Sequence, residues 1–186
     1  METNQTEPKS PPPEGQMGIK TAPDVWIDER DRWRFKDEVI SNEEILQYFK
    51  TNLHRDDDGY FIENRWGEKR ELGYLRGVFG FPLRAMSLEF LDGLTVEFLL
   101  DSGATSVSGL TELFYMDENT LAFVAPESGI PVRLSPQAMV KMSDRLLIDE
   151  QDVVWLQIPE SKKITMMSKK RDEVFPGNSD MPAYQP

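Results

Sequence analysis

Cysteine is absent from the 186-residue sequence, and histidine occurs once, as His54. Without cysteine the chain has no disulfides, no thiol catalysis and no cysteine-ligated zinc or iron–sulfur centre, and it fits a reducing compartment. A single histidine leaves little room for a Ser-His-Asp arrangement or for a multi-histidine metal site. An enzyme built from this chain would have to use carboxylates, lysine, tyrosine or a borrowed cofactor. We therefore expect no metal and no resident cofactor.

Positive charge and long apolar runs are also scarce. The chain has 21 basic and 33 acidic residues, a formal net charge of -12, and a field of that sign repels phosphate backbones. No apolar run approaches the roughly 20 residues of a membrane helix, and the first residues lack the basic and apolar segments of a signal peptide. We expect a cytoplasmic protein that binds neither nucleic acid nor membranes.

The two ends of the chain are polar, whereas the middle is rich enough in apolar residues to bury a core. Residues 1–22 include Pro11-Pro12-Pro13 and predict a disordered leader. Residues 168–186 contain Lys169-Lys170-Arg171, followed by proline and glycine, and predict a disordered tail.

Between these ends the apolar pattern predicts an α+β fold of two similar units, each a hairpin, a helix and a second hairpin. The first unit spans residues 24–84, and residues 85–167 contain central strands and the second unit. Each helix is expected to lay an apolar stripe on an antiparallel sheet. The stripes are Ile45, Phe49 and Leu53 in the first helix and Met139, Met142 and Leu146 in the second.

Both helices have a recognisable start. Ser41 with Glu44 forms a capping-box pattern, and Ser135 with Pro136 forms an N-cap followed by proline in the first turn. The two serines are 94 residues apart (135 − 41 = 94), and Phe61 and Trp155 have the same separation (155 − 61 = 94). The shared offset predicts a duplicated motif, and chance similarity of two amphipathic helices is the alternative.

The segment Asp101-Ser102-Gly103-Ala104-Thr105, after the apolar run 96–100, is the candidate catalytic site. It looks like the catalytic turn of a retroviral-type aspartic protease, which would pair two Asp101 carboxylates in a homodimer. That family's apolar-apolar-Gly strand and its Gly-rich flap have no counterpart downstream. The alternative is a hairpin bend, in which Asp accepts turn N–H groups and Gly adopts positive φ. The missing elements favour the bend and a protein without catalytic residues.

Four residues are candidates for binding a small ligand by stacking and by charge-assisted hydrogen bonds. Arg65 and Trp66 precede Gly67 at a predicted hairpin tip, where we expect them to be exposed. Tyr74 and Arg76 follow in the same half of the chain. Packing in the core is the alternative use for aromatic residues of this region.

The order of these segments resembles the bacterial domain-of-unknown-function family 1285 or a close branch of it. The resemblance covers about residues 24–166. It implies a two-unit α+β architecture with a repeated motif and a role in ligand binding or signal transduction, and it supplies no functional residues. The segments that carry it are Trp26-Ile27-Asp28, Trp33-Arg34-Phe35, Asp57-Asp58-Gly59-Tyr60-Phe61, Val96-Glu97-Phe98-Leu99-Leu100-Asp101, Asn119-Thr120-Leu121 and Ile130-Pro131-Val132-Arg133-Leu134-Ser135.

Together these features predict a non-enzymatic protein that binds a small ligand or a protein partner in the groove between its two units. Two alternatives stay open. One is a homodimeric aspartic hydrolase that uses Asp101, and the other is a purely structural interaction module whose ends become ordered on binding.

Overall fold

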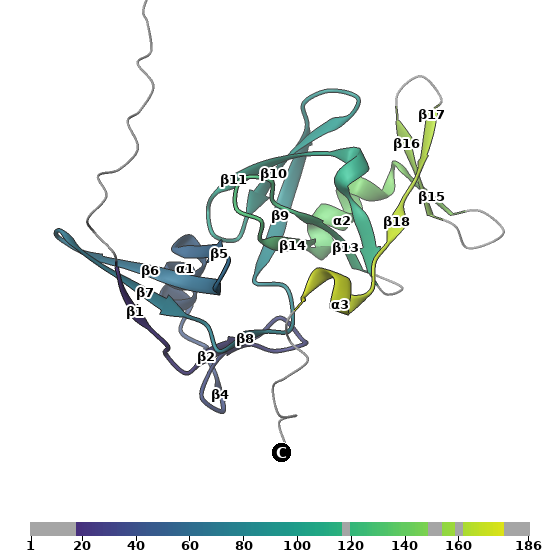
Figure 1. Ribbon diagram of the computed structural model, residues 1–186. Helices are drawn as coiled ribbons and strands as arrows, with labels where there is room; N and C mark the ends of the chain where they lie inside the picture. The colour runs from purple at the N-terminus through teal and green to yellow at the C-terminus, as the bar shows by residue number, and fades with distance from the viewer. Residues whose placement is uncertain (1–17, 117–119, 149–153, 159–161, 177–186) are drawn as a thin grey trace, which may run out of the picture.

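The computed structural model describes residues 18–116, 120–148, 154–158 and 162–176. In these residues the chain forms four β-sheets, three short α-helices and one 3-10 turn, so the predicted α+β class is confirmed (Figure 1). The longest of the helices has nine residues. None of the described helices is long and apolar enough to cross a bilayer.

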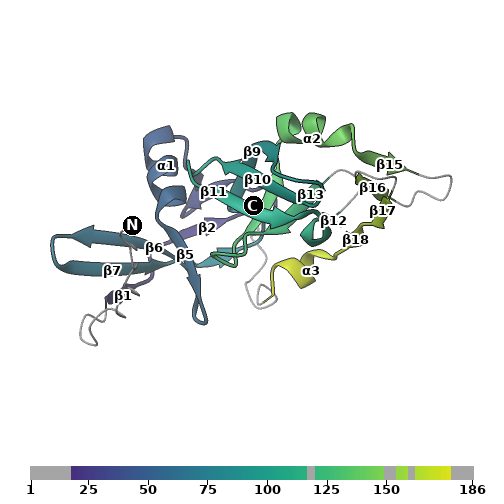
Figure 2. The ribbon, with the colours of Figure 1, turned by 90° about the horizontal axis from the view of Figure 1, so that it is seen from above.

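The largest sheet has seven strands and carries most of the core. Phe98 on β10 and Phe123 on β13 are fully buried, and their rings stack with centroids 4.3 Å apart. Three strand spacings separate β10 from β13, about 14 Å in a flat sheet, so this sheet must be curled around its apolar face (Figure 2). In spatial order its strands are β11 (Thr105–Gly109), β10 (Thr95–Leu100), β9 (Leu83–Phe90), β14 (Pro131–Leu134), β13 (Thr120–Val124), β12 (Phe114–Met116) and β18 (Met167–Ser168).

Two smaller sheets form the amino-terminal half. The hairpin of β6 (Gly59–Trp66) and β7 (Lys69–Tyr74) has the longest strands of this half and projects away from the rest of the molecule (Figures 1 and 2). One sheet contains β1 (Ile19–Thr21), β7 (Lys69–Tyr74), β6 (Gly59–Trp66) and β5 (Leu53–Asp56), in that order. The other contains β4 (Glu38–Val39), β3 (Trp33–Phe35), β2 (Val25–Ile27) and β8 (Gly77–Val78).

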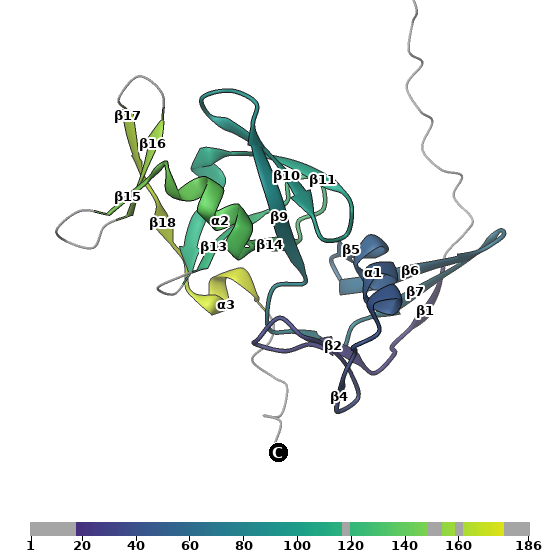
Figure 3. The same cartoon turned by 180° about the vertical axis from the view of Figure 1, so that it is seen from behind.

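Helix α2 (Pro136–Ser143) begins as the sequence predicts. The Ser135 hydroxyl accepts a hydrogen bond from the Ala138 N–H at 3.2 Å, and Pro136 occupies the first turn. Ala138 and Met142 are buried where the helix lies against β9 and β14 (Figure 3).

Helix α1 (Glu43–Thr51) differs from the prediction. Asn42, not Ser41, is the N-cap, and its side-chain oxygen accepts from the Ile45 N–H at 3.1 Å. Ile45 is 44 % exposed, and the helix ends before Leu53, which belongs to β5. The predicted stripe is therefore wrong at Ile45 and in continuing the helix to Leu53, while Phe49 packs on the core as predicted, together with Leu46.

The predicted arrangement of two similar hairpin-helix-hairpin units is not confirmed. Each helix is followed by a three-stranded antiparallel meander: α1 by β5, β6 and β7, and α2 by β15, β16 and β17. However, the central strands β9 to β11 join β14 and β13 in the seven-stranded sheet, and β9 runs across the predicted boundary between residues 84 and 85. The second meander consists of β15 (Leu146–Ile148), β16 (Val154–Ile158) and β17 (Lys162–Thr165).

The predicted disordered ends are wrong for residues 18–22 and 168–176. Strand β1 pairs in parallel with β7, and α3 (Arg171–Val174) follows β18. The Phe175 ring meets Phe81 edge-on at 5.2 Å, and both side chains are buried. Val174 is buried as well. The polar composition of the rest of the tail gave no indication that Val174 and Phe175 pack in the core. The remaining parts of the predicted ends, residues 1–17 and 177–186, lie outside the described residues.

Candidate functional site

The turn around Asp101 is a hairpin bend between β10 and β11. Gly103 has a φ of +84°, a conformation that favours glycine, and the Gly103 N–H donates to the Leu100 carbonyl at 3.0 Å. The side chain of Asp101 is only 14 % exposed. One of its oxygens accepts from Lys50 Nζ at 2.6 Å, and the other accepts from the Arg84 N–H at 2.9 Å.

Asp101 therefore connects α1 to the large sheet. Thr51 adds a second link, since its hydroxyl donates to the Ser102 carbonyl at 2.9 Å. The helix lies beside this turn (Figures 1 and 3). Both Asp101 oxygens are occupied by cationic or backbone donors, whereas an aspartic protease dyad requires a carboxylate that shares a proton with a second one.

A second aspartate, Asp31, is buried nearby in the loop between β2 and β3. Its side chain is 3 % exposed and accepts from the Phe81 N–H at 2.8 Å and from Arg133 Nη1 at 2.5 Å. Its φ of +62° lies in the left-handed region. Gly80 packs directly on this loop, because a Cβ at that position would lie 2.3 Å from the Asp28 carbonyl oxygen.

A cavity of about 210 Å³ lies between these two aspartates, and we call it the junction cavity. It is bounded by the β2–β3 region, by α1 and by the start of β9, so both halves of the fold contribute to it. Its walls are apolar and several charged side chains reach it. The lining residues are Asp31, Arg32, Trp33, Val39, Ile40, Leu46, Lys50, Phe81, Pro82, Arg84 and Asp101.

The charges around the junction cavity are mostly paired. Lys50 is bonded to Asp101, and Arg133 is bonded to Asp31. Arg32 bonds to Asp28 through Nε at 2.8 Å. Burial alone would raise the pKa of Asp28, but hydrogen bonds from the Arg32 backbone and side chain, with one from the Arg30 N–H, outweigh it and lower that pKa.

Arg84 is the exception among these cations. Its side chain is 43 % exposed, and the nearest carboxylate oxygen to its guanidinium is Asp31 Oδ2, at 3.8 Å. That separation is too long for a hydrogen bond. Among the described residues the Arg84 side chain has no hydrogen-bonded partner, although it lines the cavity.

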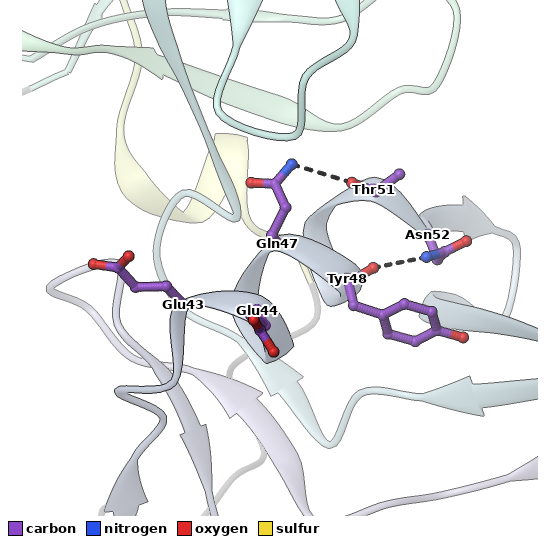
Figure 4. Close-up of a pocket in the computed structure, with 6 residues that line it drawn as sticks. All are labelled: Glu43, Glu44, Gln47, Tyr48, Thr51 and Asn52. Atoms are coloured by element: carbon purple, nitrogen blue, oxygen red, sulfur yellow. Dashed lines mark hydrogen bonds between the residues drawn. The ribbon is translucent and has the colours of Figure 1, made fainter.

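A larger depression, about 580 Å³, lies along the exposed side of α1 (Figure 4). Its lining residues all come from α1 and its C-cap, and Figure 4 shows two of its hydrogen bonds, Gln47 to Thr51 at 3.3 Å and Asn52 to the Tyr48 carbonyl at 2.8 Å. The depression lies open to solvent along this single helix, whereas the junction cavity is enclosed by several elements. The junction cavity is therefore the better candidate for a binding site, despite its smaller volume. The depression is lined by Glu43, Glu44, Gln47, Tyr48, Thr51 and Asn52.

The four residues predicted to bind a ligand do not form one groove. Arg65 and Trp66 are at the exposed tip of the β6–β7 hairpin, where Trp66 is 61 % exposed and Arg65 is paired with Glu63. Tyr74 is at the other end of β7, five residues from the pairing partner of Trp66, which corresponds to about 17 Å along a strand. Arg76 lies beyond it and is paired with Asp24 at 3.0 Å. Neither cavity described above is lined by any of the four.

The acidic turn at residues 56–59 closes the β5–β6 hairpin. Asp56 Oδ1 accepts from the N–H groups of Asp58 and Gly59, and Asp56 Oδ2 accepts from the Tyr74 hydroxyl at 2.6 Å. Asp56 thus stabilises the turn. Within the described ranges no group of three or more histidine, aspartate or glutamate side chains is arranged to hold a metal ion.

The residues of the junction cavity were missed by sequence reasoning, apart from Asp101. Arg84, Lys50 and Asp31 come from three distant segments and belong to no local motif. A weak signal was present at Gly80, which precedes Phe81-Pro82 and stands where only a residue without Cβ fits. One sequence cannot distinguish that glycine from an ordinary turn residue.

Comparison with known proteins supports the fold. No protein-family model matches the chain, and no curated protein matches it. The solved structure of a DUF1285 family protein from Silicibacter pomeroyi DSS-3 is similar, with a TM-score of 0.56 and 16 % identity over 87 % of this chain and 90 % of that chain. A DUF1285 family protein from Shewanella baltica OS155 has a TM-score of 0.47 and 15 % identity over 66 % of this chain and 91 % of that one. The likeness to the first structure confirms the resemblance to family 1285 at the level of the fold.

Proposed function

We propose that this DUF1285-like chain is a non-enzymatic binding protein whose junction cavity takes a small ligand. The supporting observation is the composition of that cavity, which combines six apolar with five charged side chains and lies at a boundary between sheets. Ligand sites favour this combination and this kind of location. Its volume equals the share of about seven liquid water molecules, so the ligand is small.

Helix α1 gives the site a connection to the surface. Leu46 and Lys50 line the cavity, whereas Ile45 and Tyr48 on the same helix are exposed. A ligand that presses on Leu46 would alter how α1 sits against the sheet, and an exposed helix surface could present that change to a partner. This is the physical basis for the signalling role that we propose. The lack of cysteine supports a cytoplasmic location.

The alternative of an aspartic hydrolase is less well supported. Asp101 is held by hydrogen bonds from Lys50 and from the Arg84 N–H, one to each of its carboxylate oxygens. Breaking them in order to pair two Asp101 side chains across a dimer would leave Lys50, which is largely buried, without its carboxylate.

Filling the cavity tests the proposal. Leu46→Phe adds volume inside it, while Ile45→Phe makes a comparable change at the neighbouring exposed position on the same helix. Ligand-observed NMR with a panel of small acids, amines and neutral molecules should find binders to the wild type. We expect Leu46→Phe to abolish their binding and Ile45→Phe to preserve it. A panel with no binder, or binders that are insensitive to Leu46→Phe, would reject the site and favour the purely structural interaction module.

A further inference from the structure

We infer that the ligand of the junction cavity is a small carboxylate and that the guanidinium of Arg84 anchors it. This inference rests on the proposed function and goes one step further, because it names the chemical class and the residue. It follows from three observations: an arginine without a hydrogen-bonded carboxylate, the balance of charge around the cavity, and the absence of free polar groups on its floor.

The first observation concerns Arg84. An arginine beside a buried aspartate normally forms a short, often bidentate ion pair. Here Asp31 takes its short bond from Arg133, and Arg84 stays 3.8 Å away. The backbone N–H of Arg84 donates to Asp101, which fixes the position of the residue without using its side chain. The guanidinium is thus held at the cavity with its planar set of donors available.

The second observation is the local charge. Three cations, Arg32, Lys50 and Arg84, line the cavity, against two carboxylates, Asp31 and Asp101. Both carboxylates have cationic partners at 2.6 Å or less. In a chain with a net charge of -12, a site with an excess of positive charge attracts an anion. Because both carboxylates are already paired, a cationic ligand would have no free carboxylate to bind in this cavity.

The third observation concerns the apolar surface of the junction cavity. Trp33 is buried, and its indole N–H donates to the Pro82 carbonyl at 3.2 Å, so the ring offers the cavity an apolar surface. Phe81, Ile40 and Leu46 complete that surface. Such walls favour a compact apolar body, while Arg84 fits a carboxylate by two parallel N–H···O bonds. The site therefore suits an aromatic or short branched acid that carries one anionic group.

Three probes with the same phenyl ring and different head groups test the inference by isothermal titration calorimetry: phenylacetate, phenylacetamide and phenethylamine. We expect phenylacetate to bind the wild-type full chain. The amide and the amine should bind about 10- to 100-fold more weakly, which is the range expected for loss of a charged hydrogen-bonded pair.

Two substitutions test whether the carboxylate of phenylacetate binds at Arg84. Arg84→Gln should weaken phenylacetate about 10- to 100-fold, and Arg84→Lys should restore part of the affinity because it keeps the charge. Arg55→Gln is the matched control: it makes the same change in net charge at an exposed arginine outside the cavity, and we expect less than a twofold effect. Arg84→Gln should fold, since Asp31 keeps its bonds to Arg133 and to the Phe81 N–H, and circular dichroism checks this.

The outcomes separate the inference from the function on which it rests. If the amide or the amine binds as tightly as the acid, and Leu46→Phe abolishes that binding, the cavity is a ligand site but the carboxylate inference is wrong. Equal phenylacetate affinity in Arg84→Gln and the wild type also overturns it. If none of the three probes binds, the inference is rejected, and the Leu46→Phe experiment with the wider panel decides the proposed function by itself.

Discussion

Gly80 offers the most direct test of how the junction cavity is built. An alanine Cβ at this position would lie 2.3 Å from the Asp28 carbonyl oxygen, 2.7 Å from Asp31 Oδ1 and 3.0 Å from the Asp31 nitrogen. Two of these neighbours are backbone atoms, so no flexible side chain can swing away. The loop that carries Asp31 has to move, and its bonds to the Phe81 N–H and to Arg133 are then stretched or broken.

The cost of Gly80→Ala follows from these contacts. Overpacking a rigid site costs about 1–3 kcal/mol, and weakening the bonds of a buried carboxylate adds about 1–3 kcal/mol. Restricting the unfolded chain returns about 0.4–1 kcal/mol. We expect the free energy of unfolding to fall by about 1–5 kcal/mol in Gly80→Ala.

Urea unfolding followed by tryptophan fluorescence measures this loss. Gly109→Ala is the matched control, because the nearest atom to its added Cβ is Thr111 Oγ1 at 3.5 Å, an ordinary contact. We expect the control to stay within about 1 kcal/mol of the wild type. A Gly80→Ala protein as stable as the control would show that the loop carrying Asp31 is not packed tightly on Gly80, and that the wall of the junction cavity is not rigid there.

Three further predictions concern other parts of the fold. Asp101→Ala should cost about 2 kcal/mol in urea unfolding, because it leaves Lys50 without its carboxylate at a largely buried site; no loss would mean that this pair does not hold α1. Burial would raise the pKa of Glu63, but hydrogen bonds from arginines 65 and 70 lower it, so its contribution to stability is present above about pH 4.3 and is lost as the pH falls through the lowered pKa. Glu63→Gln should therefore flatten the dependence of stability on pH below about 4.3, and an unchanged acid slope would contradict this. Phe175→Ala should cost about 3 kcal/mol, measured by thermal or urea unfolding, because the ring packs on Phe81; a loose tail would give no change.

The parts of the fold that the sequence predicted well are those set by local patterns. Ser135 with Pro136 identified the start of α2, because a capping hydroxyl and a proline act within one turn. The bend at Gly103 was expected from its turn residues and has the predicted positive φ. The capping-box pattern at Ser41 missed the N-cap by one residue, since Asn42 is an equally good cap and directly precedes the first helical residue.

The parts that could not be predicted depend on contacts between distant segments. Strand β9 pairs in parallel with β14, and nothing in the alternation of apolar residues specifies that neighbour. The junction cavity has the same origin, since Lys50 becomes a neighbour of Asp101 only when α1 docks on the large sheet. The predicted ligand residues Arg65 and Trp66 lie on a projecting hairpin. The sequence could not show this, because an aromatic residue beside a turn glycine does not indicate which surface it faces.

The parallel pairing of β12 with β18 has a consequence for synthesis of the chain. Phe114 on β12 is paired with Met167, more than 50 residues later, and Arg171 bonds to the carbonyl of Phe79 across 92 residues. A nascent chain that has reached β14 therefore still exposes one edge of β12, with the apolar Phe114 and Met116 beside it. Folding dominated by such distant contacts takes about milliseconds to seconds, so we expect assembly of this sheet to finish only after β18 has left the ribosome. Until then the open edge is a place where incomplete chains can aggregate.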